Sequence, residues 1–366
     1  MANVECNPPV EVVIDSSIIT TKQEKFGQSL GVSKPAMSQS SSLLTRFYAG
    51  SFRISRSLCS LAMLWKILSE PKSDSQNICR ILCMLPFTSF LWLWWLAFFA
   101  QASLSLLYIL KFLHHVGVNY LYAPWISLLL LLQSAPLTVL NKVSYPVLCW
   151  VFSVPVVLLD VKIYGQWFTT EKRFLSVFAN PTSQISVIPN FTVVERCLHV
   201  FLGMVHCMVL FITLYQHLSG SNTFPSILRP AFLLFFAAPS MGSSAWNSIS
   251  GAFDTTSKML FFLSLFLFIS LACRPALFKK SIRKFNVAWW AYSFTSTFLT
   301  LASVEYAEEG KGRVAPAIML VLSSLSVLTF LRLMLLTAAN TNKLLHEDDP
   351  ILSFVNNSKS RTFAAQ

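Results

Sequence analysis

The sequence predicts an all-α integral membrane protein, and three observations lead to this class. Of the 366 residues, 54% are hydrophobic and only 12% are charged, and the mean hydropathy is +0.58. A soluble domain needs a larger share of polar surface. Apolar windows of about 20 residues, the length that crosses a bilayer core, recur between residues 44 and 339. The chain is therefore expected to face lipid over most of its length.

Composition divides the chain into three regions. Residues 1–43 are polar and rich in Ser, Thr and Lys, which predicts a disordered cytoplasmic tail. Residues 44–339 form the expected transmembrane domain, and residues 340–366 a short cytoplasmic C-terminal tail. The serine cluster near residue 40 is either a site for a regulatory kinase or a solubilising feature.

The transmembrane region consists of plain apolar blocks and one partial segment. The blocks lie near residues 46–68, 86–110, 118–138, 146–165, 197–217, 230–250, 257–277, 287–306 and 315–338. The partial segment at 183–194 is too short to span the membrane alone, and its Pro189 lacks a backbone donor. We therefore expect a partial helix there.

Basic residues in the loops set the orientation. The loop after Leu277 is basic and contains no acid, so the positive-inside rule places it in the cytoplasm. If the partial segment crosses the membrane, both termini are cytoplasmic as well. Without that crossing the N-terminal half inverts.

Arginines and prolines inside the blocks leave two interpretations open. Arg53 and Arg56 lie three residues apart in the first block and Arg332 lies in the last, each at a cost of about 2.5–3.5 kcal/mol at mid-membrane. They either snorkel toward the interface or line an anion path. The net charge of +12 fits an anionic permeant and equally fits binding to acidic membrane lipids. Prolines within several blocks indicate either a wet conduit or ordinary kinked packing.

Other classes of function lack the residues they need. The eight cysteines form no CxxC pair, and neither the histidines nor the acids fall at metal-binding or catalytic spacing. We predict no metal, no cofactor, no nucleic-acid partner and no enzymatic activity.

Several strings carry a family resemblance. They are RFYAGSFRIS, VNYLYAPW, VKIYGQW, FANPTSQISVI, LYQHL, FFAAPSMGSSAWN and FNVAWWAYSF, in this order between residues 46 and 294. Together they resemble the plant slow-type anion channel family and, more distantly, bacterial tellurite-resistance and C4-dicarboxylate transporter proteins. The resemblance extends from residue 44 to about residue 340.

This resemblance implies a fold and a function. The fold is ten transmembrane helices arranged as five hairpins, with the odd-numbered helices around a central pore in each subunit of a homo- or heterotrimer. The function is chloride and nitrate conduction across the plasma membrane, with malate as a further candidate anion. Phe294 takes the place of the family's gating aromatic ring. The expected pore-lining or pore-mouth residues are Gly50, Arg53, Pro124, Lys172, Arg173, Pro239, Ser240, Arg274 and Trp290.

The sequence also departs from the family pattern. Thr295 follows Phe294 where a proline is common, the fifth helix is shortened, and Arg56 and Arg332 replace apolar residues. Two alternatives therefore stay open. One is an electrically silent modulatory subunit of a heteromeric channel, and the other is a carrier for malate or similar C4-dicarboxylates.

Overall fold

The computed structural model describes most of the predicted transmembrane region. The described residues are 49–69, 87–112, 122–136, 144–169, 187–192, 197–219, 226–282, 285–310 and 312–341. All of them belong to the unit formed by residues 44–366. The predicted N-terminal tail and nearly all of the predicted C-terminal tail lie outside the described residues.

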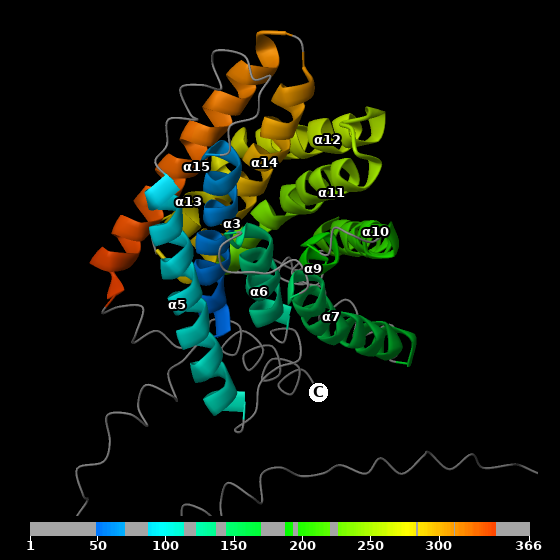
Figure 1. The fold of residues 1–366 in the computed structure, drawn as a ribbon, viewed down its shortest axis with the longest axis vertical. Coiled ribbons are helices and arrows are strands. Elements are labelled where there is room, and N and C mark those ends of the chain that lie inside the picture. Colours follow the sequence, from blue (N-terminus) through cyan, green and yellow to red (C-terminus); the bar gives the residue numbers. More distant parts are fainter. Residues whose placement is uncertain are drawn as a thin grey trace, which may run out of the picture. The chain divides into compact units, whose positions relative to one another are not determined.

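Every regular element in the described ranges is helical, which agrees with the predicted all-α class (Figure 1). Five helices contact one another in a closed cycle. In cyclic order they are α3 (Phe52–Ser69), α6 (Tyr122–Ser134), α9 (Ile188–Thr192), α11 (Leu234–Ser250) and α14 (Trp290–Glu309). We call these the inner helices.

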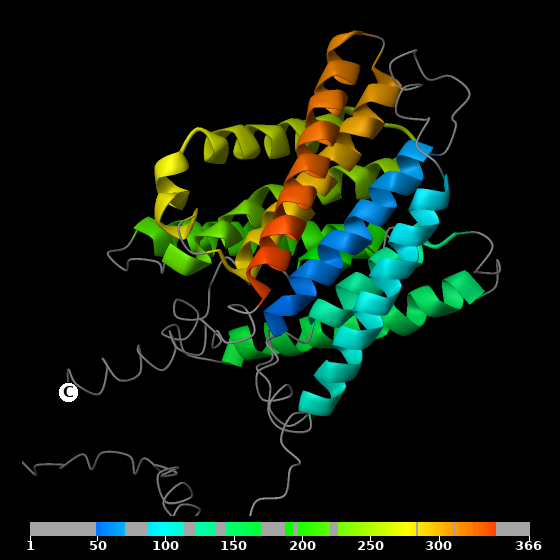
Figure 2. The ribbon, with the colours of Figure 1, turned by 90° about the vertical axis from the view of Figure 1, so that its left-hand side faces the viewer.

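Five further helices pack against the inner helices. They are α5 (Phe87–Phe112), α7 (Ser144–Thr169), α10 (Cys197–Ser219), α12 (Thr255–Ala272) and α15 (Val314–Ala339). Each of these outer helices contacts the inner helix that precedes it in the sequence. The pairs α3–α5 and α14–α15 run side by side in two perpendicular views (Figures 1 and 2).

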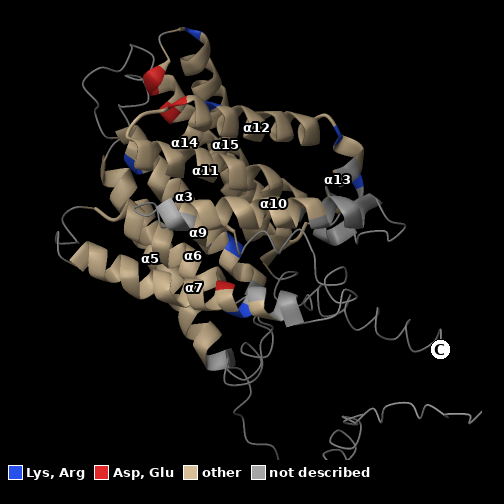
Figure 3. Cartoon of the chain, turned by 90° about the vertical axis from the view of Figure 1, so that its right-hand side faces the viewer, with Lys and Arg blue, Asp and Glu red and all other residues tan. Residues whose placement is uncertain are grey.

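The outer helices carry the apolar surface. Among the described residues, every large hydrophobic side chain that is exposed lies on an outer helix, with the single exception of Trp246. Four outer helices, α5, α7, α12 and α15, are long and apolar enough to cross a membrane by length and composition, and the described helices show few charged residues (Figure 3). Exposure of this much apolar side-chain surface to water would be unfavourable, whereas contact of the same surface with lipid is favourable. The protein is therefore a membrane protein.

Two local structures differ from the sequence predictions. Pro189 lies at the second residue of α9, where the missing amide has no intrahelical partner to lose, so the proline falls at the start of the helix and does not interrupt it. The basic segment after Arg274 contains a short helix, α13 (Pro275–Ile282), where we predicted a loop. Its first residue is a proline, which is well suited to open a helix.

The turn between α11 and α12 depends on a glycine and an aspartate. Gly251 adopts φ +72° and its N–H donates to the carbonyl of Asn247. Asp254 caps α12 by accepting from the backbone N–H of Ser257 at 3.0 Å, and it also accepts from Nε1 of Trp246 at 2.9 Å. These two bonds hold the pKa of the Asp254 carboxyl below its usual value.

We expect Gly251→Ala to lower the free energy of unfolding by about 1–2 kcal/mol, because a side chain disfavours left-handed backbone. Thermal unfolding of the detergent-solubilised protein measures the change. Gly165→Ala on α7 is the matched control, since a Cβ there meets nothing within 4 Å and alanine favours a helix. An equal loss of stability in both variants would contradict the prediction.

Candidate functional site

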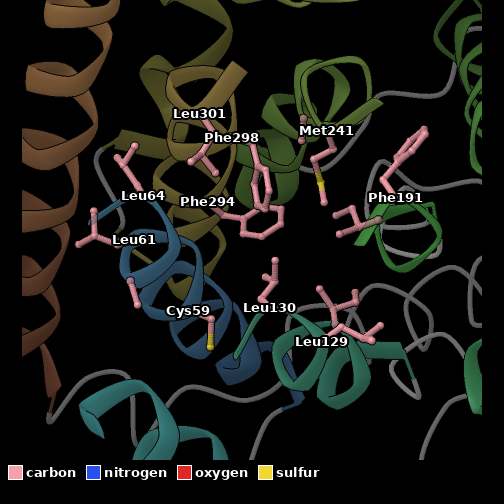
Figure 4. Close-up of a cluster of buried hydrophobic side chains, with 14 of the residues drawn as sticks. Cys59, Leu61, Leu64, Leu129, Leu130, Phe191, Met241, Phe294, Phe298 and Leu301 are labelled. Atoms are coloured by element: carbon pink, nitrogen blue, oxygen red, sulfur yellow. The ribbon is translucent and has the colours of Figure 1, made fainter. Parts of the chain in front are cut away.

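The inner helices enclose an apolar cluster. Phe294 and Phe298 of α14 extend toward Leu130 of α6 and Met241 of α11, as Figure 4 shows. Phe191 of α9 belongs to the same cluster. All five side chains are buried. The cluster therefore fills the space among helices that come from widely separated parts of the sequence.

Phe294 lies within contact distance of an aromatic ring and a cation. The ring of Phe294 is 2% exposed. Its centroid lies 5.0 Å from that of Phe298 at an interplanar angle of 61°, an edge-to-face geometry that aromatic pairs favour. The Cζ atom of Arg56 lies 5.5 Å from the Phe294 centroid, inside the range of a cation–π interaction. Arg56 of α3 and Phe298 of α14 thus both contact the Phe294 ring.

The two arginines of α3 are buried in protein. Arg53 and Arg56 are each 3% exposed. A snorkelling side chain carries its charged head to water, so this burial argues against the snorkelling interpretation. On the same helix, Ser57 Oγ donates to the carbonyl of Trp290 at 2.9 Å, which ties α3 to α14 close to Phe294.

Trp290 is directed toward an outer helix. It is fully buried, and its Nε1 donates to Oγ1 of Thr337 on α15 at 3.0 Å. Its ring meets that of Phe330 edge to face with centroids 5.7 Å apart. This predicted pore residue therefore anchors α14 to α15.

The predicted small and proline residues are buried, in the inner helices or directly before α3. Gly50 lies in the short helix η1 (Ala49–Ser51) that precedes α3. The carbonyl of Pro124 accepts from Nε2 of Gln101 at 3.1 Å. Pro239 lies inside α11, and Ser240 Oγ shares its proton between the carbonyls of Phe236 at 2.9 Å and Ala237 at 2.8 Å. The Ser240 hydroxyl thus bonds to its own helix.

The remaining predicted residues lie apart from Phe294 or outside the described ranges. Arg274 is exposed at the junction of α12 and α13, so the structure does not bring it to the apolar cluster. Lys172 and Arg173 lie outside the described residues.

Sequence reasoning missed a buried polar cluster beside α9. The carboxylate of Asp160 on α7 accepts from Tyr122 Oη at 2.7 Å and from Asn190 Nδ2 at 2.9 Å. All three residues are at most 2% exposed. The sequence feature that could have indicated this cluster is Asp160, an acidic residue inside the apolar block at 146–165. We call Tyr122, Asp160 and Asn190 the α6–α7–α9 tie, because each residue comes from a different helix.

Hydroxyl groups on α14 form a second feature that was not predicted. Thr297 Oγ1 donates to the carbonyl of Ser293 at 2.8 Å and also lies 3.0 Å from Ser326 Oγ on α15. Thr300 Oγ1 lies within hydrogen-bond distance of the carbonyls of Ser296 and of Leu322 on α15. α14 runs unbroken from Trp290 to Glu309 without an internal proline. The hydroxyls of Thr297 and Thr300 are thus bonded to backbone or to α15.

Comparisons with known proteins identify the family of the chain. Residues 46–338 match the SLAC1 family, described as voltage-dependent anion channels. The chain is 53% identical to S-type anion channel SLAH1 of Arabidopsis thaliana, covering 96% of this chain and 95% of that protein. It is 52% identical to S-type anion channel SLAH4 of the same plant, over 94% and 96% of the two chains. It is also 38% identical to the guard cell S-type anion channel SLAC1, over 77% of this chain and 54% of that protein. The chain therefore belongs to the SLAC1 family of voltage-dependent anion channels.

Proposed function

We propose that this protein is a slow-type anion channel that passes chloride and nitrate across the plasma membrane. The observation that carries the proposal is the buried Phe294 ring among the inner helices, held by Phe298 and by the cation of Arg56. Most of the chain matches relatives named as S-type anion channels. In this proposal each subunit has its own pore, which Phe294 closes.

The finer fold belongs to the same proposal. Ten transmembrane helices form five hairpins, each made of one inner helix and the outer helix that follows it. The closed cycle of contacts among α3, α6, α9, α11 and α14 supports this arrangement. Among the described residues, the segment expected to be the fifth transmembrane helix contains α9, which is five residues long.

A rotamer change at Phe294 would open the pore. A buried aromatic ring closes a narrow apolar passage sterically and by excluding water, and χ1 rotation moves the ring between staggered positions. In this proposal the described structure is the closed form, which the packing of Phe294, Leu130 and Met241 in one buried cluster supports. Arg53 and Arg56 supply positive charge beside this passage, as an anion path requires.

Assembly and topology complete the proposal. The protein forms a homo- or heterotrimer with related subunits. Residues 1–43 and 340–366 are cytoplasmic tails. The N-terminal tail is phosphorylated by a regulatory kinase. The basic residues in and around α13, including Lys279, support a cytoplasmic position for the segment between α12 and α14. Lys172 and Arg173 are expected at the cytoplasmic pore mouth, whereas the exposed Arg274 would act on incoming anions only at long range.

An electrically silent modulatory subunit remains the second candidate. The observation in its favour is the extent of the apolar cluster, in which Phe298 adds a second ring behind Phe294. A passage closed by two rings demands a larger rearrangement to conduct. A modulatory subunit would change the currents of a conducting relative and pass none by itself.

Purified protein in proteoliposomes tests conduction directly. We expect chloride and nitrate to exchange across the vesicle membrane down their gradients, with malate slower, because a dicarboxylate carries two hydrated charges into an apolar passage. Flux that saturates with malate and requires a counter-substrate would favour a carrier. Absence of flux, together with altered currents of a co-expressed S-type channel, would favour the modulatory subunit.

A further inference from the structure

A short basic helix follows directly after a helix that can span the membrane. α12 is long and apolar enough to cross and ends at Ala272. α13 begins only three residues later, at Pro275. A helix that begins so close to the end of a span lies near the boundary between hydrocarbon and water. α13 is therefore expected at the level of the lipid headgroups.

The segment between α12 and α14 carries positive charge and no negative charge. The nearest acids in the sequence are Asp254 and Glu305, and Figure 3 shows basic residues but no acidic residue along this segment. Clusters of roughly four to eight basic residues beside a transmembrane helix favour acidic lipid headgroups. The five basic residues are Arg274, Lys279, Lys280, Arg283 and Lys284, of which the last two lie outside the described residues.

The buried face of α13 fixes the helix against its neighbours. Phe278 and Ser281 are buried, whereas Arg274 and Lys279 are exposed. The ring centroid of Phe278 lies 6.0 Å from that of Trp289, and Nε1 of Trp289 donates to the carbonyl of Ser281 at 3.4 Å. The exposed cations thus project from a packed helix, which favours a defined binding site over diffuse attraction to a charged surface.

A neighbouring element adds a further basic residue. The 3₁₀ helix η4 (Ser226–Leu233) contacts α13 and carries Arg229, which is half-buried. Two segments that are distant in the sequence therefore bring positive charge to one part of the molecule. Positive charge concentrated in this way suits a compact headgroup with several phosphates better than it suits headgroups of single charge.

Apolar side chains beside the cations favour a lipid over a soluble phosphate. Phe266 and Ile269 lie in the last two turns of α12, and they are 65% and 50% exposed. Side chains of this kind provide a surface for acyl chains directly before the basic segment begins at Arg274. The arrangement matches the two parts of a phospholipid, an apolar tail and an anionic headgroup.

We propose that Arg274 and Lys279 bind the headgroup of a phosphoinositide, a lipid whose inositol ring carries phosphate groups. The guanidinium of Arg274 and the ammonium of Lys279 donate charge-assisted hydrogen bonds to the phosphate oxygens. The acyl chains lie along the exposed apolar side chains of α12. The assignment to the cytoplasmic leaflet rests on the topology in the proposed function, whereas the binding itself does not.

Native mass spectrometry of the full-length protein in detergent measures this binding. The protein is titrated with dioctanoyl phosphatidylinositol bisphosphate, and we expect one bound lipid per subunit. The double variant Arg274→Gln with Lys279→Gln should raise the dissociation constant roughly tenfold or more, because two cations are lost from the site. The double variant Arg274→Lys with Lys279→Arg keeps both charges and should bind nearly as tightly as the wild type.

The matched control removes two positive charges elsewhere. Lys258 lies in the first turn of α12, and Arg313 lies between α14 and α15, so each is at the end of its helix pair that is distant from α13. The double variant Lys258→Gln with Arg313→Gln should bind the lipid like the wild type. An equal loss of affinity in this control would overturn the site, because the lipid would then respond only to net charge.

Two further ligands test the identity of the lipid. Dioctanoyl phosphatidylserine should bind more weakly, and equal affinity would reduce the interaction to attraction toward any acidic lipid and overturn the proposal. Inositol trisphosphate lacks acyl chains, so its binding as tightly as the lipid would overturn the assignment to a membrane lipid. Lipid binding that depends on Arg274 and Lys279 in a protein without anion flux would support the site and refute the proposed conduction.

Discussion

Replacing Phe294 with alanine is expected to raise anion current at least roughly tenfold, because the substitution removes the ring that fills the centre of the inner helices. The ring is 2% exposed and contacts both Phe298 and Arg56. Truncation to a methyl group leaves space that water and anions can enter. Voltage clamp of oocytes at matched surface expression, in baths that alternate chloride and nitrate, measures the change. The current should reverse near the equilibrium potential of the anion.

The control for this experiment is a buried phenylalanine elsewhere. Phe261 on α12 is fully buried but belongs to a separate apolar cluster, so Phe261→Ala disturbs packing without opening the proposed passage. If Phe294→Ala and Phe261→Ala are both silent at the surface, the double variant Phe294→Ala with Phe298→Ala decides whether the second ring closes the passage. Silence in the double variant would contradict the Phe294 gate and favour the modulatory subunit.

Replacing Asp160 with alanine is expected to destabilise the protein by on the order of 2–6 kcal/mol, since it leaves two buried donors without an acceptor at about 1–3 kcal/mol each. The donors are the hydroxyl of Tyr122 and the amide of Asn190. The α6–α7–α9 tie links the short helix α9 to two longer helices. Its loss should therefore release α9 and reduce the yield of folded protein. Thermal unfolding in detergent measures the loss of stability.

Two variants calibrate this result. Tyr122→Phe removes a single hydrogen bond of the tie, and we expect it to cost about 1–3 kcal/mol. Ser153→Ala on the same helix as Asp160 removes a buried hydroxyl that bonds to a carbonyl of its own helix, that of Cys149, so its effect should be small. If Asp160→Ala is no more harmful than Ser153→Ala, the tie does not hold α9 in place.

The class and the family could be predicted from the sequence, because both depend on local information. Lipid contact requires long apolar stretches, and these are visible in composition and hydropathy. The strings that carry the family resemblance are short and contiguous, and the comparisons confirm the resemblance. Phe294 was identified only through the resemblance, since nothing in its immediate surroundings distinguishes it from the other 30 of the 31 phenylalanines.

The contacts that give individual side chains their roles could not be predicted. Asp160 and its partners Tyr122 and Asn190 are separated by 38 and 30 residues, and only the packing of three helices brings them together. The contact of Arg56 with Phe294 likewise joins α3 to α14. From the sequence alone, snorkelling explained Arg53 and Arg56 equally well, because burial depends on neighbours that no local pattern reveals.

The α6–α7–α9 tie also determines whether the chain can carry sugar at residue 190. Asn190, Phe191 and Thr192 form the acceptor sequence for N-linked glycosylation. The atom that would be glycosylated, Nδ2 of Asn190, donates to Asp160 in a fully buried position, and Gly203 of α10 approaches so closely that an added Cβ would lie 3.2 Å from Cβ of Asn190. An oligosaccharide has no room there, so the folded protein carries none at this sequence.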